Sequence, residues 1–267
     1  EVLKGQGAYY NPMLATNGEN VDHVGYTTDI IPERSLDWLK NKRDRDKPFL
    51  LMTQQKAPHG RWEPAIRHLQ VFANMDMPEP ATLFDDYSGR ARPLSQNRAR
   101  ILEEMNDFRL MIKYSSKHTP EQLKPFDDYF RPRNEAMLAA NLNDFERKKW
   151  NYQRYIKNYL RCVRAVDEGV GQLLEYLDES GLAENTIVIY SSDQGFYLGE
   201  HGLFDKRWMY EESLRTPLLV RWPGIAKAGS VNDTDIVSNL DFAQTFLDLA
   251  GAEIPDDMQG RSLVPVF

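Results

Sequence analysis

One stretch of the sequence places an acid, an amide, an imidazole and an ammonium group after an apolar run. It is IYSSDQGFYLGEHGLFDKR, residues 189–207, and it contains Asp193, Gln194, His201 and Lys206. A carboxylate beside an amide oxygen offers two hard oxygen donors, which suit Ca²⁺ or Mg²⁺ better than a soft metal. The stretch therefore indicates part of a metal site with a cation beside it.

Two residues do not complete a calcium site, because Ca²⁺ takes roughly six to eight oxygen ligands. The remaining ligands would have to come from other segments. The alternative is that Asp193 caps the turn that follows it and that Gly195 supplies a positive φ in that turn.

A second group of candidate residues lies at KAPHG, residues 56–60, where Lys56 and His59 follow an apolar run. Together with Lys206 they offer charges and donors that can hold a tetrahedral anion and stabilise charge building on its oxygens. Single lysines on loops are usually solvated, so this interpretation depends on their convergence. His201 either faces the same pocket or forms hydrogen bonds within its own loop.

The elements that would carry these loops follow from hydrophobic patterning. Three apolar runs predict buried strands: PFLLMTQQ, TIVIYSS and PLLVRWPG. Apolar residues spaced three and four positions apart predict two amphipathic helices. The strands cover 48–55, 186–192 and 217–224, and the helices 151–180 and 238–251. This order predicts an α/β fold with a layered, mixed and largely parallel sheet flanked by helices. Both loops would then meet at the carboxyl edge of the sheet.

The rest of the chain reads as connections around this layer. Residues 62–149 are polar and rich in proline, and we interpret them as a helical excursion on one side, with a helix near 99–113. Residues 1–25 read as an irregular surface segment. Both ends of the chain look cut from something longer, so we interpret 1–267 as incomplete at both ends.

Composition excludes several classes of function. The chain has 267 residues, 41% of them hydrophobic, and a net charge of −7, which argues against a general nucleic-acid or anionic-membrane surface. No apolar run is long enough to span a bilayer, and the first residues do not read as a signal peptide. The single cysteine, Cys162, allows no intramolecular disulfide and sits in the apolar stripe of a predicted helix, as a buried core thiol would. No phosphate-binding P-loop and no G-x-S-x-G motif occurs.

Three segments resemble the formylglycine-dependent sulfatases of the alkaline phosphatase superfamily. They are KAPHG, YSSDQGFYLGEHGLFDKRWMYEESLRTPLLVRWPG and NLDFAQTFLDLAGAEIPDDMQGRSLVP, and with the helix ending VDEGVGQLLEYLDESG the similarity spans nearly the whole chain. Within the family the chain is similar to bacterial glycan sulfatases that include N-acetylglucosamine 6-sulfatases and iduronate sulfatases. The resemblance implies an alkaline-phosphatase-like fold and sulfuric ester hydrolysis on a sulfated sugar.

The resemblance also implies roles for individual residues. Asp193 and Gln194 would be two calcium ligands, with Gln194 where relatives often have Asn or His. Lys56 and His59 would contact the sulfate, and His59 would also protonate the leaving alcohol. Lys206 would bind sulfate oxygens.

The nucleophile motif of the family does not occur in this sequence. In the family, Cys-x-Pro-Ser-Arg or Ser-x-Pro-Ser-Arg is oxidised to formylglycine, and an acidic pair and a Lys-x-His motif complete the site. These motifs would precede Glu1, and a smaller carboxyl-terminal subdomain would follow Phe267. We therefore expect the chain to be the middle of a sulfatase and to be inactive alone.

Two other functions stay open at the level of sequence. One is a phosphoester or phosphonate hydrolase of the same superfamily, because the same metal and cations suit phosphate. The other is a non-catalytic module that binds sulfated glycan. The family implies a periplasmic or secreted protein, or a lysosomal one in a eukaryote, and the sequence does not indicate an oligomeric state.

Overall fold

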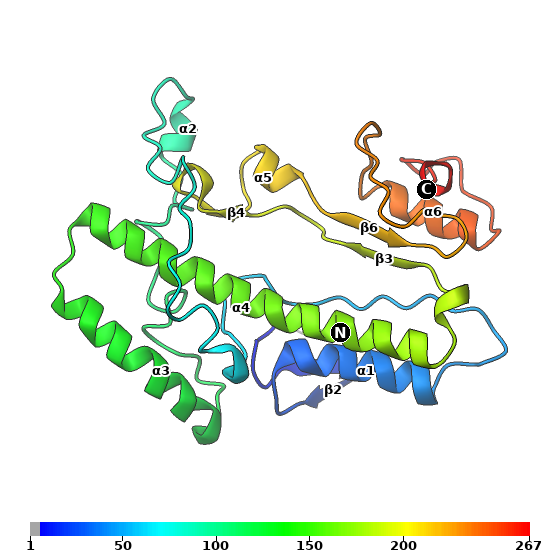
Figure 1. The fold of residues 1–267 in the computed structure, drawn as a ribbon, viewed down its shortest axis with the longest axis horizontal. Helices are drawn as coiled ribbons and strands as arrows, with labels where there is room; N and C mark the ends of the chain where they lie inside the picture. Colours follow the sequence, from blue (N-terminus) through cyan, green and yellow to red (C-terminus); the bar gives the residue numbers. More distant parts are fainter. Residues whose placement is uncertain (1–5) are drawn as a thin grey trace. The chain divides into compact units, whose positions relative to one another are not determined.

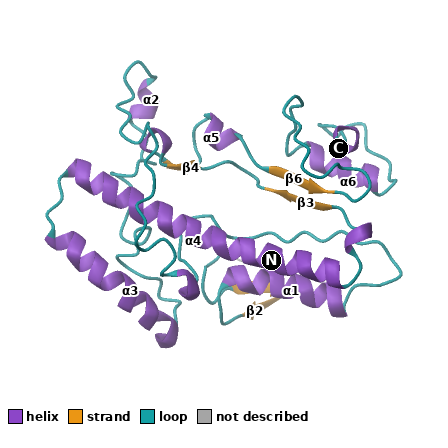
Figure 2. Ribbon diagram, viewed as in Figure 1, coloured by secondary structure: helices purple, strands orange, loops and turns teal. Residues whose placement is uncertain are grey.

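The chain forms two compact units in the structure, a computed structural model that describes residues 6–267. Unit 1 contains the described residues up to Tyr176 together with Phe196–Trp208. Unit 2 contains Leu177–Gly195 and Met209–Phe267. Figures 1 and 2 show the helices and strands of both units.

Unit 1 is built on the long helix α4 (Asp144–Glu179), whose last residues belong to unit 2. Helices α1 (Thr27–Asn41) and α3 (Pro120–Ala139) lie alongside α4 (Figure 1). On α1, the Lys40 ammonium lies 5.1 Å from the centre of the Tyr176 ring of α4. The other elements of unit 1 are short: β1 (Met13–Thr16), β2 (Glu19–Asp22), η1 (Ile66–His68), α2 (Arg92–Ser95), β4 (Tyr197–Leu198), η3 (Glu200–Gly202) and β5 (Phe204–Asp205).

Helix α4 confirms the helix predicted over 151–180, and its ends have identifiable causes. At its start, the Asn143 side chain accepts from the Glu146 N–H at 3.0 Å, and the Glu146 carboxylate accepts from the Asn143 N–H at 3.0 Å. This reciprocal pair satisfies two backbone donors that the first helical turn leaves open. Gly181, with φ +71°, follows the last turn in the left-handed conformation that glycine adopts without steric cost.

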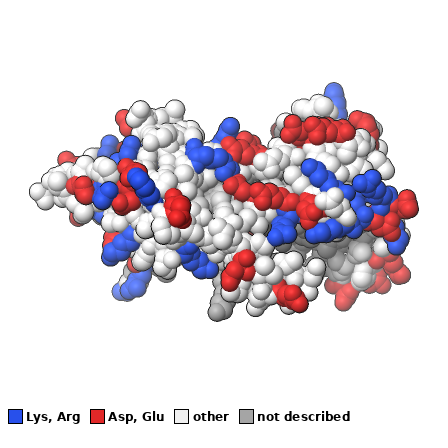
Figure 3. Space-filling view, turned by 90° about the horizontal axis from the view of Figure 1, so that it is seen from below, with Lys and Arg blue, Asp and Glu red and all other residues white. Residues whose placement is uncertain are grey.

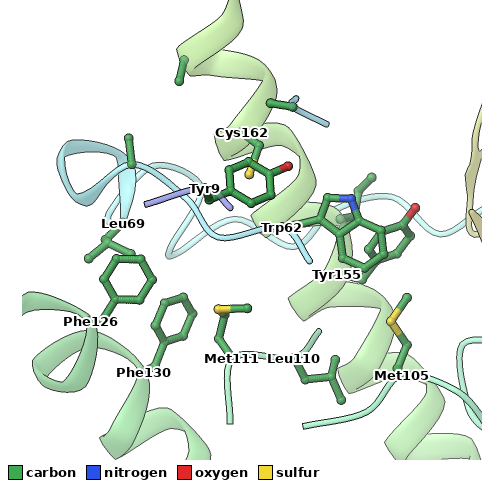
Figure 4. Packing of buried hydrophobic residues seen from close by; sticks show 14 of the residues in the cluster. Tyr9, Trp62, Leu69, Met105, Leu110, Met111, Phe126, Phe130, Tyr155 and Cys162 are labelled. Carbon is green, nitrogen blue, oxygen red and sulfur yellow. The ribbon is translucent and has the colours of Figure 1, made fainter. Parts of the chain in front are cut away.

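The polar segment 62–149 supplies much of the core of unit 1, rather than decorating the outside of the main layer as predicted. Its buried residues pack with aromatic residues of the first segment and of α4 (Figure 4). They include Trp62, Leu83, Ile101, Leu110, Met111, Phe126 and Phe130. Tyr9 and Tyr10 are also buried, so residues 6–25 are not confined to the surface.

The helices within this segment differ from the prediction. No helix forms over residues 99–113, which are turns and bends, so that prediction is wrong. The main helix of the segment is α3, in spite of Pro125 and Pro132 inside it. A capping box between Thr119 and Gln122, with Pro120 at the first helical position, starts α3.

Unit 2 contains a two-stranded sheet and several short helices. β3 (Val188–Ser191) pairs antiparallel with β6 (Leu218–Arg221), with Ile189 opposite Val220. The helical elements are η2 (Ala183–Asn185), α5 (Glu211–Leu214), α6 (Asp241–Leu249) and η4 (Val264–Val266). Two of the three predicted strands are therefore present.

The predicted largely parallel sheet is not found among residues 6–267, where every paired strand is antiparallel. Residues 48–55, predicted as a buried strand, pair with no other described strand. Leu50 and Met52 are 64% and 61% exposed. An apolar run predicts a strand only where neighbouring strands can bond its backbone, and the described part of the chain provides none here.

Helix α6 turns a polar face inward, whereas the prediction placed its apolar residues there. Asp241, Gln244 and Thr245 are buried, and Leu240 is 57% exposed. The buried side chains bind the backbone of the last residues: Asp241 Oδ1 accepts from Arg261 N–H at 2.9 Å and Thr245 Oγ1 from Leu263 N–H at 2.8 Å. These bonds satisfy backbone groups of a segment without regular strands.

Among residues 6–267, the helices all fall short of the length and apolar character that a membrane crossing requires. On the face shown in Figure 3, lysine and arginine side chains are interspersed with aspartate and glutamate.

Candidate active site

The loop that carries Lys56 and His59 is held from behind by tyrosine side chains. Three buried tyrosines donate hydrogen bonds to its backbone carbonyl groups, and Trp62 Nε1 donates to Pro58 O at 2.8 Å. The three bonds are Tyr9 Oη to His59 O at 2.8 Å, Tyr26 Oη to Glu63 O at 3.0 Å and Tyr10 Oη to Pro64 O at 2.8 Å. The aromatic segment near residue 9 thus fixes the position of the loop.

His59 has one ring nitrogen fixed and lines a cavity of about 260 Å³. Its Nδ1 lies 3.0 Å from the carbonyl oxygen of Gly60, and only a protonated nitrogen can donate to that acceptor. The bond therefore selects the Nδ1–H tautomer and leaves Nε2 to exchange a proton with a ligand.

Burial lowers the pKa of His59 below its usual range. The charges of Lys56 and Lys206 lower it further, whereas the bond to Gly60 and the charge of Asp205 oppose the shift. The charges of Lys56 and Lys206 therefore both act on the His59 ring. A negatively charged ligand beside His59 would raise its pKa again and favour the protonated ring.

Lys56 is buried, with 8% of its surface exposed. Its ammonium lies 3.5 Å from the carbonyl oxygens of His59 and Gly60 and 4.3 Å from the centre of the Tyr9 ring. Burial lowers the pKa of Lys56 to about 8, although the Glu63 carboxylate opposes this. Lys56 is thus a cation at neutral pH that also supports the backbone of the His59 loop.

Lys206 follows β5, and its backbone N–H donates to Asp205 Oδ1 at 2.9 Å. Its ammonium lies 6.0 Å from the centre of the Phe196 ring. Phe196 and Asp205 both line the cavity of His59, which places Lys206 beside that cavity.

His201 lies in a different set of contacts. Its Nδ1 is 3.1 Å from Asp85 Oδ2 and 3.2 Å from the Arg90 guanidinium, and those two residues form an ion pair at 2.8 Å. His201 is not among the residues that line the His59 cavity. These contacts join His201 to the segment of Asp85 and Arg90 rather than to its own loop, and a substrate-binding role stays a prediction.

The cavity also has walls that the sequence interpretation missed. They include two arginines, an amide and three aromatic rings: Arg61, Trp62, Asn106, Arg109, Phe196 and Phe204. The Arg109 guanidinium lies 4.8 Å from the centre of the Phe204 ring. Arg61 could have been found from its place after KAPHG. Asn106 and Arg109 lie far along the chain, in turns without a motif, so no sequence signal marked them.

Asp193 and Gln194 belong to unit 2, where both are exposed directly after β3. The Asn239 amide donates to Asp193 O at 2.9 Å. Among the described residues no hydrogen bond is formed by the Asp193 carboxylate, so the alternative that it caps the next turn gains no support.

Gly195 is needed for a close approach and not for a positive φ, which corrects the alternative stated above. A Cβ at this position would lie 2.2 Å from Glu212 O and 2.6 Å from Arg215 O. The glycine thus lets the segment after Asp193 and Gln194 pack against α5.

The donors of Asp193 and Gln194 fit a hard cation, because both are oxygens and both are exposed. In residues 6–267 there is no group of three or more His, Cys, Asp or Glu that could hold a metal ion. These two residues would therefore supply only part of a calcium coordination sphere.

Comparisons with known proteins agree with the resemblance. A family model described as N-sulphoglucosamine sulphohydrolase, C-terminal, matches residues 199–267. The chain is 44% identical to N-acetylglucosamine-6-O-sulfatase of Bacteroides thetaiotaomicron, over 98% of this chain and 50% of the relative. It is 29% identical to human N-acetylglucosamine-6-sulfatase, over 99% of this chain and 41% of the relative.

A solved structure shows the same similarity in three dimensions. This structure contains a protein in complex with its substrate D-glucosamine-2-N,6-O-disulfate. The present chain matches that protein with a TM-score of 0.94 and 42% sequence identity. The match covers 99% of this chain and 57% of that chain. The predicted α/β, alkaline-phosphatase-like fold of the sulfatases is thereby confirmed. In sequence and in fold the chain is similar to the sulfatases over nearly its whole length, and it spans about half the length of the curated relatives it matches.

Proposed function

We propose that the chain is part of a sulfuric ester hydrolase that acts on a sulfated sugar, with a 6-O-sulfated glucosamine derivative as the substrate class. One observation carries the proposal: His59, with Nδ1 anchored, lines a cavity and lies in range of the charges of Lys56 and Lys206. The names of the relatives, both 6-sulfatases of N-acetylglucosamine, support the sugar.

In this proposal His59 acts as the proton donor to the leaving alcohol. As the bond between sulfur and the sugar oxygen breaks, that oxygen takes the proton from Nε2 and leaves as a neutral hydroxyl group. Without a ligand, the lowered pKa keeps His59 largely neutral near pH 7. Binding of the anionic ester would raise the pKa and load the ring with the required proton.

Lys206 and Lys56 stabilise the negative charge that develops on the sulfate oxygens. Lys206 does so directly from beside Asp205. The Lys56 ammonium contacts two carbonyl oxygens of the loop, so its charge acts on the sulfate through space while it also fixes the His59 backbone. Charges placed in a partly buried site need little reorganisation during the reaction.

The metal and the nucleophile complete the proposal. Asp193 and Gln194 would hold part of a Ca²⁺ site, with Mg²⁺ as the other hard cation that suits these oxygens. The cation would neutralise sulfate charge, and a formylglycine outside this sequence would supply the attacking oxygen. The chain alone is therefore expected to be inactive. An exported location is also part of the proposal, supported by a Drosophila relative named an extracellular sulfatase.

The test is turnover of 6-O-sulfated N-acetylglucosamine by the full-length parent protein. His59→Ala and Lys206→Ala should each lower kcat/KM at least ~100-fold, as expected for loss of acid catalysis and of charge stabilisation. Lys227→Ala is the matched control, because Lys227 is exposed and lies in unit 2. Rates near those of the wild type in both site variants would rule out these assignments.

A further inference from the structure

A second, larger cavity adjoins the cavity of His59. Its volume is about 580 Å³, within the usual range of small-molecule pockets. Gly60 and Arg61 line both cavities, so the two cavities share the segment that directly follows His59. The proposed reaction uses one residue that lines this second cavity, Lys56, but assigns no role to Arg61 or Lys117, which line it as well.

The second cavity is rich in positive charge. Lys56, Arg61 and Lys117 line it, and Glu63 is the one acidic residue among the described residues that line it. The chain as a whole carries a net charge of −7, so the cavity reverses the prevailing sign. A concave site with one sign of charge concentrates ligands of the opposite sign, here anions.

Glu63 cancels these charges only in part near neutral pH. Burial raises the pKa of Glu63 to about 7, although Arg61 and Lys56 oppose the shift. On its other side, the His118 ring lies with Nε2 3.7 Å from Glu63 Oε2. His118 Nδ1 donates to Ser115 O at 3.0 Å, and burial lowers the pKa of this histidine, so it adds an acceptor rather than a charge.

The rim that carries Lys117 is fixed by hydrogen bonds. The Asn11 amide donates to Lys117 O at 2.5 Å, and the Lys117 N–H donates to Ser115 Oγ at 3.2 Å. The side chain of Lys117 is exposed on this anchored backbone, together with that of Ser116. The cavity therefore has a buried cation, Lys56, at its base and an exposed cation at its rim.

The two cavities are close enough to serve one substrate. His59 and Arg61 are two residues apart, so their Cα atoms are separated by at most about 7 Å. Substituents on one sugar residue, or on two linked residues, span such a separation. An anion in the second cavity would therefore be part of the molecule whose ester group lies at His59.

We propose that the second cavity binds a second anionic group of the substrate, a sulfate or a carboxylate, with Lys117 as a specificity-determining residue. This proposal rests on the proposed function and extends it: the preferred substrate carries at least two negative groups. A sulfate on the same sugar and the carboxylate of a linked uronic acid share this chemistry.

The test compares KM for three substrates of the full-length parent protein. They are 6-O-sulfated N-acetylglucosamine, 2-N,6-O-disulfated glucosamine, and 6-O-sulfated N-acetylglucosamine linked to a hexuronic acid. Lys117→Gln should raise KM about fivefold for a substrate whose second anion enters the cavity, the value expected for one charge pair at a solvated rim. Lys117→Glu should raise it roughly 25-fold, because the attraction becomes an equal repulsion. KM for the singly sulfated sugar should stay unchanged.

Lys113→Glu is the matched control, since Lys113 carries the same charge on the same segment but pairs with Asp107 outside the cavity. Unchanged KM values in both Lys117 variants, or equal effects of Lys113→Glu, would overturn the proposal. The substrate that responds identifies the sulfate or the carboxylate as the second group. If the wild-type parent hydrolysed none of the three sugars, the proposed function would fail. Calorimetric binding of the disulfated sugar to wild type and Lys117→Glu would then still decide the role of the cavity.

Discussion

Replacement of Glu63 by glutamine should make the protein more stable at alkaline pH. Glu63 is buried below the loop of His59, and burial raises its pKa from 4.5 to about 7. Glutamine has nearly the same shape as the protonated acid and carries no charge. The substitution therefore removes the cost of a buried carboxylate without removing the side chain.

The sign and size of the effect follow from the two pKa values. Between pH 4.5 and about 7 the folded protein keeps a proton that the unfolded chain loses. Stability contributed by protonated Glu63 is thus fully present below pH 4.5 and is lost as the pH rises through 7. At about 1.4 kcal/mol per unit of pKa shift, the resulting difference in the free energy of unfolding is roughly 3 kcal/mol. For a protein of this size that corresponds to a rise in Tm of roughly 6–12 °C at pH 8.

The assay is thermal unfolding of the full-length parent at pH 8 and at pH 4.5, followed by circular dichroism. Glu63→Gln should unfold at a higher temperature than the wild type at pH 8, and the two should coincide at pH 4.5. Glu135→Gln, at an exposed position of α3, should match the wild type at both values. A lower Tm for Glu63→Gln at pH 8 would show that Glu63 is charged and stabilised in the fold, which would refute the reasoning.

Three further predictions concern the remaining parts of the site. Gly195→Ala should destabilise unit 2 by about 1–3 kcal/mol in urea unfolding, because its Cβ would lie 2.2 Å from a backbone oxygen of α5. Gly171→Ala, with open space around its Cβ, should be neutral or stabilising. Equal effects of the two substitutions would contradict the packing argument. Calcium should bind the 267-residue chain with a dissociation constant above the micromolar range in calorimetry. In the full-length parent, Asp193→Asn should weaken calcium binding at least roughly tenfold. Tight calcium binding by the 267-residue chain alone would contradict a ligand set that is divided between this chain and the rest of the parent. Tyr9→Phe should keep the aromatic ring at the Lys56 loop but lose the hydrogen bond to His59 O. This loss should lower kcat roughly 2- to 10-fold and shift the pH profile of kcat, with little change in KM. A lower Tm with normal kinetics would show a purely structural role.

The helices whose signals are local could be predicted from the sequence, and those that depend on context could not. The apolar spacing of 151–180 predicted α4, because one helix buries one stripe of its own residues. Helix α3 forms over 120–139 in spite of the prolines inside it, since the capping box at Thr119 and the packing of Phe126 and Phe130 outweigh their cost. Residues 48–55 have a strand pattern but no strand beside them among the described residues.

The sequence by itself indicated the resemblance to the sulfatases and the candidate residues of the site. The candidates are recognisable because metal and anion chemistry restricts the side chains that could serve in such a site. They are Lys56, His59, Asp193, Gln194 and Lys206. Motif and identity sufficed for this much, since both are properties of the chain read in order.

Only the tertiary structure decided how the candidate residues are used. It anchors Nδ1 of His59, buries Lys56 against two carbonyl oxygens and engages His201 with Asp85. It also joins Lys117 to the loop of residues 56–61 in one cavity. Hydrogen-bond partners, burial and the resulting pKa values arise between segments that are far apart in the chain, and no local pattern specifies them.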